Sequence, residues 1–332
     1  MFQIKITARF LLSIAGFFLL AAIAARPAFA VQCGDVIQTD LKLTANLNCT
    51  GNGLRVFGPL PGAPNITIDL NGHDITGDGT GMGVFIFDGQ VTLKGRGRIS
   101  NFEVGVSLIT ARDVEIYDLT IENNQAGIAL FRSSRVRMFD NTIRAGANGL
   151  SGVIMSVVSH TALYRNTISG FSDVGVIIPS GDPPDESIPV ISENIIRENQ
   201  TGISIRGLDS DSIIRGNHVV DNKLNGIEIA SIFEAGCTIQ ENQVLRNGGH
   251  GILLQGGDLT GCLIANNLVE KNGLSGINIL EDVQPRNQGI LVEGNRLSRN
   301  GTDLLWDGVS NSCWLQNVFV TSSPLVLPKC PL

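Results

Sequence analysis

Apolar and polar residues alternate with a period of two along most of the chain, and the alternation recurs within a repeated unit. Four segments show the unit clearly: SENIIRENQTGISI, RGNHVVDNKLNGIEI, QENQVLRNGGHGILL and ANNLVEKNGLSGINI. In each unit an asparagine, called the anchor, follows an apolar residue by three positions, and a glycine further on precedes a second alternating pair. The period of two predicts short β-strands, while frequent Asn and Gly leave no room for a helix of useful length.

The anchor position can be followed through ten units, spaced 22 to 28 residues apart. The anchors are His73, Gly97, Leu119, Asn141, Asn166, Asn194, Asn217, Asn242, Asn267 and Asn295. A unit of this length cannot bury its apolar face alone and must stack on its neighbours. Three short parallel strands per unit predict an all-β, single-domain right-handed parallel β-helix of about ten turns. A leucine-rich repeat has a similar period, but its leucine signature is absent.

The anchor asparagines are expected to lie directly above one another in such a stack. A second column of asparagines consists of Asn199, Asn222, Asn247, Asn272 and Asn300. Because an amide side chain both donates and accepts, each column is predicted to form a hydrogen-bonded ladder. His73 falls in the anchor column and is expected to replace an asparagine there.

His250 stands in a Gly-His-Gly triplet, a pattern that can mark a catalytic histidine. The equivalent positions in other units are Thr201, Asn225 and Ser275, which are small or polar turn residues. His250 is therefore predicted to be another turn residue.

The six cysteines are expected to form three disulfides, because an even number in an exported chain favours disulfides over thiol chemistry. Cys237 and Cys262 both lie five residues before their anchors, on neighbouring turns about 4.8 Å apart. These two are predicted to bond to each other. The other four would then tie the two ends of the solenoid, as Cys33–Cys49 and Cys313–Cys330.

Residues 1–30 are predicted to be a signal peptide that is removed. Lys5 and Arg9 precede an apolar run, which ends in a cleavage site with small residues at Ala28 and Ala30. The run is short for a membrane span, and no span is expected after cleavage, so we predict a secreted or periplasmic protein. The remaining chain divides into an N-terminal cap (31–64), the β-helix repeats (65–305) and a C-terminal cap (306–332).

The charge of the chain argues against nucleic acid as a partner. The net charge is −7 at pH 7, and removal of the three basic residues of the signal peptide changes it to −10. A polyanion would be repelled on average, and no cluster of basic residues compensates for this.

With this repeat and the segment ITIDLNGH at 66–73, the chain resembles the right-handed parallel β-helix repeat family of the pectin-lyase-like superfamily. That superfamily includes pectate lyases, alginate-modifying enzymes and NosD-type periplasmic proteins. The resemblance implies contact with polysaccharide, with lyase or C5-epimerase activity on uronate glycans as the enzymatic option. A non-catalytic structural, surface or accessory protein is the alternative. The Asp-Pro-His-Asp motif of alginate epimerases is absent, so no catalytic residue is carried over.

An outward column two residues before the anchors carries the most unusual side chains. The two tyrosines of the chain, Tyr117 and Tyr164, fall there, with Phe139 on the turn between them. At steps of roughly 5 Å, the three rings are predicted to form a strip on which sugar rings can lie. The other interpretation is an aromatic stack that only stabilises the outer sheet.

Charged residues flank this column on the same turns. Arginines can neutralise uronate carboxylates, and a neighbouring Tyr or His can move the proton at C5. The predicted catalytic residues are Tyr164, His160, Arg137 and Arg165. The predicted substrate-binding residues are Tyr117, Phe139, Arg135 and Glu115.

Carboxylates recur along one edge, on the turn that follows the second alternating pair. Asp209, Glu234 and Asp258 represent this edge on three successive turns. Oxygen-rich edges suit Ca²⁺, so these three are predicted metal ligands. The alternative is a solvated edge that serves solubility, and no other cofactor is expected.

Overall fold

The computed structural model describes residues 30–58, 65–179, 188–206, 212–230, 236–256, 261–280, 288–306 and 311–330. The chain divides into two units, Met1–Val31 and Gln32–Leu332, and every described strand lies in the second. Apart from Ala30, the predicted signal peptide lies outside the described residues. Within the described ranges, no helix is long and apolar enough to cross a membrane.

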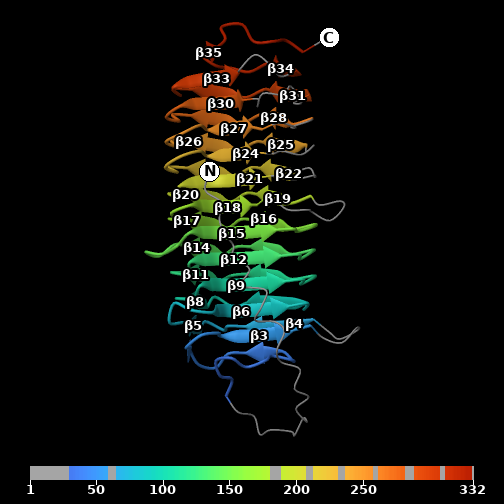
Figure 1. Ribbon diagram of the computed structural model, residues 1–332, viewed down its shortest axis with the longest axis vertical. Helices are drawn as coiled ribbons and strands as arrows, with labels where there is room; N and C mark the ends of the chain where they lie inside the picture. Colours follow the sequence, from blue (N-terminus) through green and yellow to red (C-terminus); the bar gives the residue numbers. More distant parts are fainter. Residues whose placement is uncertain are drawn as a thin grey trace. The chain divides into compact units, whose positions relative to one another are not determined.

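The strands of the second unit form three parallel sheets, and the chain visits the sheets in turn as it climbs from one rung to the next (Figure 1). Sheet I consists of β1 (Leu41–Lys42), β4 (Ile66–Asp69), β7 (Val91–Lys94), β10 (Glu115–Tyr117), β13 (Arg137–Phe139), β16 (Ala162–Tyr164), β19 (Val190–Ser192), β22 (Ser212–Arg215), β25 (Cys237–Gln240), β28 (Leu263–Ala265), β31 (Gln288–Glu293) and β34 (Asn311–Leu315).

Sheet II consists of β2 (Leu47–Asn48), β5 (Asp74–Thr76), β8 (Arg98–Ser100), β11 (Thr120–Glu122), β14 (Thr142–Arg144), β17 (Thr167–Ser169), β20 (Ile195–Arg197), β23 (His218–Val220), β26 (Gln243–Leu245), β29 (Leu268–Glu270) and β32 (Arg296–Ser298). Sheet III consists of β3 (Leu54–Phe57), β6 (Met82–Phe87), β9 (Val104–Ile109), β12 (Ala126–Phe131), β15 (Ser151–Ser156), β18 (Val174–Ile178), β21 (Thr201–Arg206), β24 (Ile227–Ala230), β27 (Ile252–Gln255), β30 (Ser275–Leu280), β33 (Thr302–Trp306) and β35 (Ser322–Ser323). This is the parallel β-solenoid that the repeat predicts.

The predicted register is confirmed, because each anchor from His73 to Asn295 immediately precedes a strand of sheet II. The ten anchors therefore enclose nine full turns. Strands also occur in both terminal segments, with β1–β3 at one end and β34 and β35 at the other. The boundaries of the caps, at 31–64 and 306–332, stay predictions.

The core is built from apolar columns that point into the solenoid. The residue three positions before the anchor is at most 1% exposed on eight successive rungs: Ile116, Met138, Leu163, Ile191, Ile214, Ile239, Ile264 and Val292. Each of these residues pairs in register with the next along sheet I. Stacking thus buries every apolar layer against the layers above and below it.

The anchor asparagines form the predicted ladder inside the stack. The side-chain amide of Asn166 donates to Asn194 Oδ1 at 3.0 Å and to the carbonyl of Met138 at 2.9 Å. Its oxygen accepts from the backbone and side chain of Asn141, both at 3.0 Å. The same bonds repeat up to Asn317, so each amide pairs backbone groups that the strands leave unpaired at the corner.

The second asparagine column forms a ladder as well, from Asn199 to Asn300. Its upper end is closed by Asp303, which is 1% exposed and accepts from Asn300 Nδ2 at 2.9 Å. The other oxygen of Asp303 accepts from the backbone of Val320 at 2.8 Å. A buried carboxylate therefore joins the ladder to the C-terminal segment.

His73 differs from its prediction. Its ring Nδ1 lies 3.3 Å from Asn46 Oδ1, on the rung below. The next anchor upward is Gly97, which has no side chain to continue a ladder. The imidazole therefore contacts the N-terminal segment instead of an asparagine ladder.

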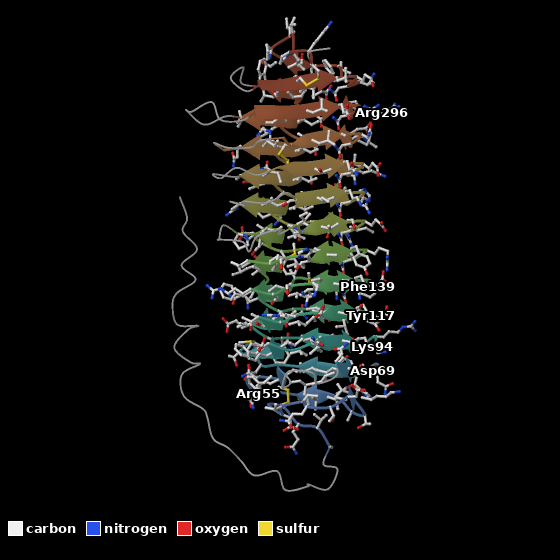
Figure 2. The ribbon with its side chains drawn as sticks, turned by 90° about the vertical axis from the view of Figure 1, so that its right-hand side faces the viewer. Arg55, Asp69, Lys94, Tyr117, Phe139 and Arg296 are labelled. Atoms are coloured by element: carbon white, nitrogen blue, oxygen red, sulfur yellow. A yellow bond between two sulfur atoms is a disulfide. The ribbon has the colours of Figure 1, made fainter. Side chains whose placement is uncertain are left out.

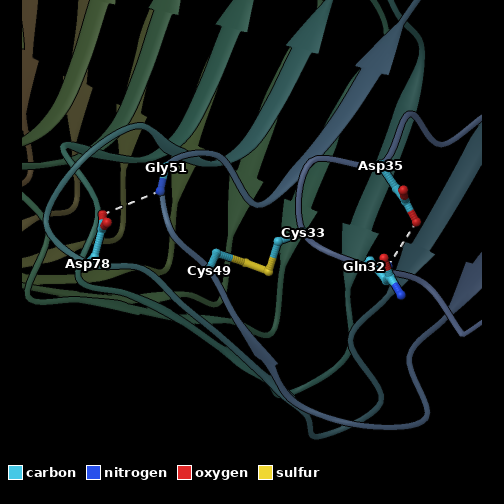
Figure 3. The surroundings of a disulfide bond; sticks show 6 residues. All are labelled: Gln32, Cys33, Asp35, Cys49, Gly51 and Asp78. Atoms are coloured by element: carbon cyan, nitrogen blue, oxygen red, sulfur yellow. Dashed lines mark hydrogen bonds between the residues drawn. A yellow bond between two sulfur atoms is a disulfide. The ribbon is translucent and has the colours of Figure 1, made fainter.

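The three disulfides are those predicted. The Cα atoms of Cys237 and Cys262 are 4.4 Å apart on adjacent rungs. Cys33–Cys49, shown in Figure 3, and Cys313–Cys330 link residues within each terminal segment. Near the first bridge, the backbone of Gly51 donates to Asp78 Oδ1 of a later rung, which holds the terminal segment against the solenoid.

Candidate functional site

The outward column of sheet I exists as predicted. Tyr117 pairs with Phe139, and Phe139 pairs with Tyr164, on three consecutive rungs. Figure 2 shows Asp69, Lys94, Tyr117 and Phe139 one above another on one side of the solenoid. Parallel pairing without a shift in register places these side chains one rung apart.

The three aromatic rings stack on one another. The ring centroids of Tyr117 and Phe139 are 4.7 Å apart with an angle of 10° between the planes. Those of Phe139 and Tyr164 are 5.0 Å apart at 9°. The faces between the rings are thus occupied, so the column differs from the flat strip that was expected. Only ring edges and the two outermost faces can meet a ligand.

Carboxylates of adjacent rungs orient the arginines beside this column. Arg135 bonds Asp113 through two nitrogens, at 2.6 and 2.8 Å. Arg165 bonds Asp140 in the same way, at 2.9 and 2.8 Å. These bonds hold the pKa of Asp113 and of Asp140 below the usual range of an aspartate.

Arg137 donates to Glu115 on the rung below, so all three predicted arginines belong to ion pairs. Their side chains remain about half exposed or more, at 56% for Arg135, 60% for Arg137 and 47% for Arg165. Exposed pairs of this kind contribute little stability, but they hold each guanidinium in one orientation with N–H groups free to face solvent.

Four predicted residues meet around one depression of about 490 Å³. We call it the His160 hollow, and its lining is Asn65, Asp113, Glu115, Arg135, Arg137 and His160. The two arginines balance the two carboxylates, so the hollow offers many hydrogen-bond donors and acceptors and little net charge.

The other predicted residues do not line the His160 hollow. Phe139, Tyr164 and Arg165 lie along the aromatic column, where the Arg165 guanidinium is 4.7 Å from the centroid of the Tyr164 ring. Tyr117 instead lines a second depression of about 470 Å³. We call it the Tyr117 hollow, and its lining is Asp69, Asn71, Gly72, Lys94, Gly95, Arg96, Tyr117 and Asp118.

The predicted Ca²⁺ ligands Asp209, Glu234 and Asp258 lie outside the described residues. Elsewhere, across the part of the chain that the structure describes, no group of three or more His, Cys, Asp or Glu side chains could hold a metal ion.

Sequence reasoning missed an aromatic group on sheet III. The ring centroids of Phe57, Phe85 and Phe87 lie 6.0 to 6.4 Å apart; Phe57 and Phe85 meet edge to face, and the other two pairs are tilted. Arg55 lies over Phe57, at 5.9 Å from its ring centroid. The signal was present in the alternation VFIF at 84–87, which puts two phenylalanines on the outward face of one strand.

His250 occupies the turn column that the alignment assigns to it. Its backbone donates to Asn225 Oδ1 at 3.0 Å on the rung below, and its Nδ1 lies 2.6 Å from Ser275 Oγ on the rung above. Burial lowers the pKa of His250, and the charge of Glu228 only partly opposes that effect. Ser275 is 1% exposed, so this contact joins two rungs inside the turn.

Family models match most of the solenoid. A model described as a right handed beta helix region matches residues 82–233. A second model, described as the periplasmic copper-binding protein NosD, matches residues 189–326. No curated protein matches the chain.

Solved structures of low sequence identity share the fold. The periplasmic alginate epimerase AlgG aligns with 14% identity and a TM-score of 0.55, over 83% of this chain and 77% of that one. The A-module of mannuronan C-5 epimerase AlgE4 from Azotobacter vinelandii aligns with 14% identity and a TM-score of 0.54, over 86% and 89%. An exopolygalacturonase from Thermotoga maritima aligns with 11% identity and a TM-score of 0.59, over 83% and 84%.

Stacked parallel rungs, asparagine ladders and these matches define the class of protein: a right-handed parallel β-helix. Its fold is shared with these epimerase and exopolygalacturonase structures.

Proposed function

We propose that the protein is exported and binds polysaccharide on the outer face of sheet I. The main support is the His160 hollow beside the aromatic column. It brings together four residues from three adjacent rungs: Glu115, Arg135, Arg137 and His160. Three proteins with a similar fold are an alginate epimerase, a mannuronan C-5 epimerase and an exopolygalacturonase. Their substrates support a glycan as the ligand class here.

The chemistry of the hollow suits a ligand that is rich in hydroxyl groups. The carboxylates of Asp113 and Glu115 can accept from sugar hydroxyls, while the free N–H groups of Arg135 and Arg137 can donate to hydroxyl or carboxylate oxygens. An acidic, uronate-containing glycan would use these donors in charge-assisted bonds. The balanced charge of the hollow also admits neutral segments of such a polymer.

The test of binding is retention on immobilised alginate, pectate and glycosaminoglycans. Arg137→Ala should weaken retention about tenfold or more, because hydrogen bonds to charged groups contribute about 1.5–3 kcal/mol. Arg296→Ala, an exposed change on sheet II, is the matched control and should be retained like the unmodified protein. Equal retention of both variants would contradict the proposal, as would failure of the unmodified protein to bind any of the polymers.

A second candidate function is lyase or C5-epimerase activity on the bound glycan. It is favoured by the presence of an imidazole, from His160, in the same hollow as two guanidinium groups. In that arrangement the arginines would hold the uronate carboxylate and His160 would take the proton at C5. The electron pair left at C5 would then break the C4–O bond in a lyase, or take up a proton on the opposite face of C5 in an epimerase.

Catalysis is tested by following unsaturated uronate ends by ultraviolet absorbance and C5 inversion by NMR. His160→Ala should abolish either signal while retention on the polymer persists. If the unmodified protein changes none of the three polymers, the enzymatic function is excluded and binding alone remains.

Export is supported by the three disulfides, which persist in oxidising compartments. Mass spectrometry of the protein from the periplasm or the medium should give a mature N-terminus at Val31. A protein that keeps residues 1–30 and remains in the cytoplasmic fraction would contradict export.

A further inference from the structure

The aromatic column ends differently on its two sides. Above Tyr164 the next residue in register is Ser192, which is only 7% exposed, and the Arg165 guanidinium lies 4.7 Å from the centroid of the Tyr164 ring. Below Tyr117 the next residue is Lys94, and no cation–π contact joins Lys94 to Tyr117 within the described ranges. Phe139 stacks on one face of Tyr117, and Tyr117 lines the Tyr117 hollow together with Lys94.

The turn that lines the Tyr117 hollow is one residue longer than the turn that follows Tyr117. After β7 two residues, Gly95 and Arg96, precede the anchor, whereas a single residue does so after β10. Gly95 has φ 114, and a Cβ there would lie 2.1 Å from Asp69 Oδ1. Only glycine fits this position, because Asp69 and the backbone of the rung below occupy the space that a side chain would need.

Two cations reach the hollow without an ion pair. Lys94 and Arg96 form no salt bridge with any described carboxylate, in contrast to Arg135, Arg137 and Arg165. Their donors are therefore available to a ligand at lower cost, because no existing pair must be broken or shared. Asp69, whose Oδ1 accepts from the backbone of Asn71 at 2.8 Å, and Asp118 add two carboxylates to the lining, so the selectivity for a carboxylate depends on the two cations being free of ion pairs.

A tyrosine ring and two cations without an ion pair, all lining one hollow, fit a particular ligand. A pyranose ring presents an apolar C–H face that can cover Tyr117, and a carboxylate on the ring can pair with Lys94 or Arg96. Glu115 of the His160 hollow and Tyr117 project from the same side of β10, about 7 Å apart. One glycan chain can therefore contact both hollows.

We propose that the Tyr117 hollow is a subsite for a carboxylated sugar ring, which stacks on Tyr117 and pairs with Lys94 and Arg96. This inference rests on the proposed function and assigns the selectivity for uronate to the Tyr117 hollow, separate from the His160 hollow. The His160 hollow then holds the chain, and the Tyr117 hollow recognises its acidic unit.

The test compares the affinities of a uronate trisaccharide and the corresponding neutral trisaccharide by calorimetry. Tyr117→Ala should weaken uronate binding about fivefold or more, as expected for the loss of a stacked ring. Tyr117→Phe should bind normally, because it keeps the ring, and Phe131→Ala, which removes an exposed ring on sheet III, is the matched control. Lys94→Ala and Arg96→Ala should weaken uronate binding and leave neutral trisaccharide binding unchanged.

The outcomes separate the subsite from the proposed function. If Tyr117→Ala, Lys94→Ala and Arg96→Ala all bind like the unmodified protein while Arg137→Ala does not, the subsite is refuted and the glycan-binding function stands. If the unmodified protein binds neither trisaccharide nor polymer, both are refuted. Thermal unfolding of each variant checks its fold. Lys94→Ala changes a side chain at the surface, so it still tests the subsite if Tyr117→Ala does not fold.

Discussion

Single asparagines carry much of the internal polar pairing. Asn242 is 1% exposed, and its oxygen accepts from both the backbone and the side chain of Asn217, at 2.9 and 3.0 Å. Its amide donates to the carbonyl of Ile214 and to Asn267. Every member of the ladder satisfies its neighbours, so removal of one leaves several buried groups without a partner.

Asn242→Ala should therefore lower the free energy of unfolding by about 2–4 kcal/mol, since each buried group left unpaired costs about 1–3 kcal/mol. Urea unfolding followed by circular dichroism measures this. Gln243→Ala, an exposed neighbour in β26, is the control and should change stability by no more than about 0.5 kcal/mol. Equal effects of the two substitutions would argue against a structural ladder.

Glu122 is an outward residue of β11 whose side chain is only 7% exposed. Arg98 and Arg144, from the rungs on either side, both bond its carboxylate. Burial by itself raises the pKa of Glu122, but the bonds and charges of Arg144 and Arg98 outweigh it, so the pKa lies below its usual value.

This lowered pKa makes the stability of the protein depend on pH. A carboxyl group with a lower pKa in the folded state contributes stability above its unfolded pKa of about 4.3, and the contribution is lost as the pH falls through the folded value. Glu122→Gln should thus destabilise the protein at pH 7, and the difference should shrink as the pH falls below about 4.3. Urea unfolding across that range tests this, and a constant difference down to low pH would contradict it.

The turns between strands set where side chains can project. The residue before each anchor has a left-handed backbone, with φ between 54° and 62° from Arg96 to Gln316. Gly216 is one member, and a Cβ there would meet nothing closer than 3.7 Å. A second column of glycines lies at the start of the strands of sheet III, and Gly226 belongs to it. A Cβ on Gly226 would lie 2.6 Å from Val244 Cγ1 and 2.7 Å from the carbonyl oxygen of Gly251.

These two glycines should respond differently to alanine. Gly216→Ala meets only backbone strain, partly offset by a less flexible unfolded chain, and should cost about 1 kcal/mol. Gly226→Ala forces neighbouring atoms to move and should cost about 2–3 kcal/mol. Chemical unfolding of both variants gives the comparison, and a larger effect at Gly216 would show that backbone strain rather than crowding selects glycine.

The solenoid as a whole must protect the ends of its sheets, because an unpaired edge of parallel strands is a template for another chain. At the C-terminal end, β34 covers β31 and β35 covers β33. Asp303 binds this segment to the second ladder, and Cys313–Cys330 holds it closed.

Removal of residues 311–332 should expose these edges and cause end-to-end association that increases with concentration. Sedimentation velocity over a range of concentrations measures it. The full-length Cys313→Ser, Cys330→Ser double variant keeps the covering strands and should sediment as the unmodified protein does. A truncated protein that does not associate at any concentration would show that the C-terminal strands are not needed as a cover.

The sequence alone determined the period of the repeat and the register in which its rungs stack. Counting from the anchors placed Tyr117 beneath Phe139 and Cys237 beside Cys262, as the structure has them. This is possible because parallel rungs repeat the same backbone bonds, so equal positions in the repeat become neighbours in space.

Only the tertiary structure decided what those neighbours present to a ligand. The rings of the aromatic column turned out to stack, and the predicted arginines turned out to be paired, while Lys94 and Arg96 had passed unnoticed. Side-chain rotation decides whether a ring shows its face or its edge, and the residues of the turns decide which groups line a hollow. Neither is set by the period of the repeat, and both depend on which atoms occupy the next rung.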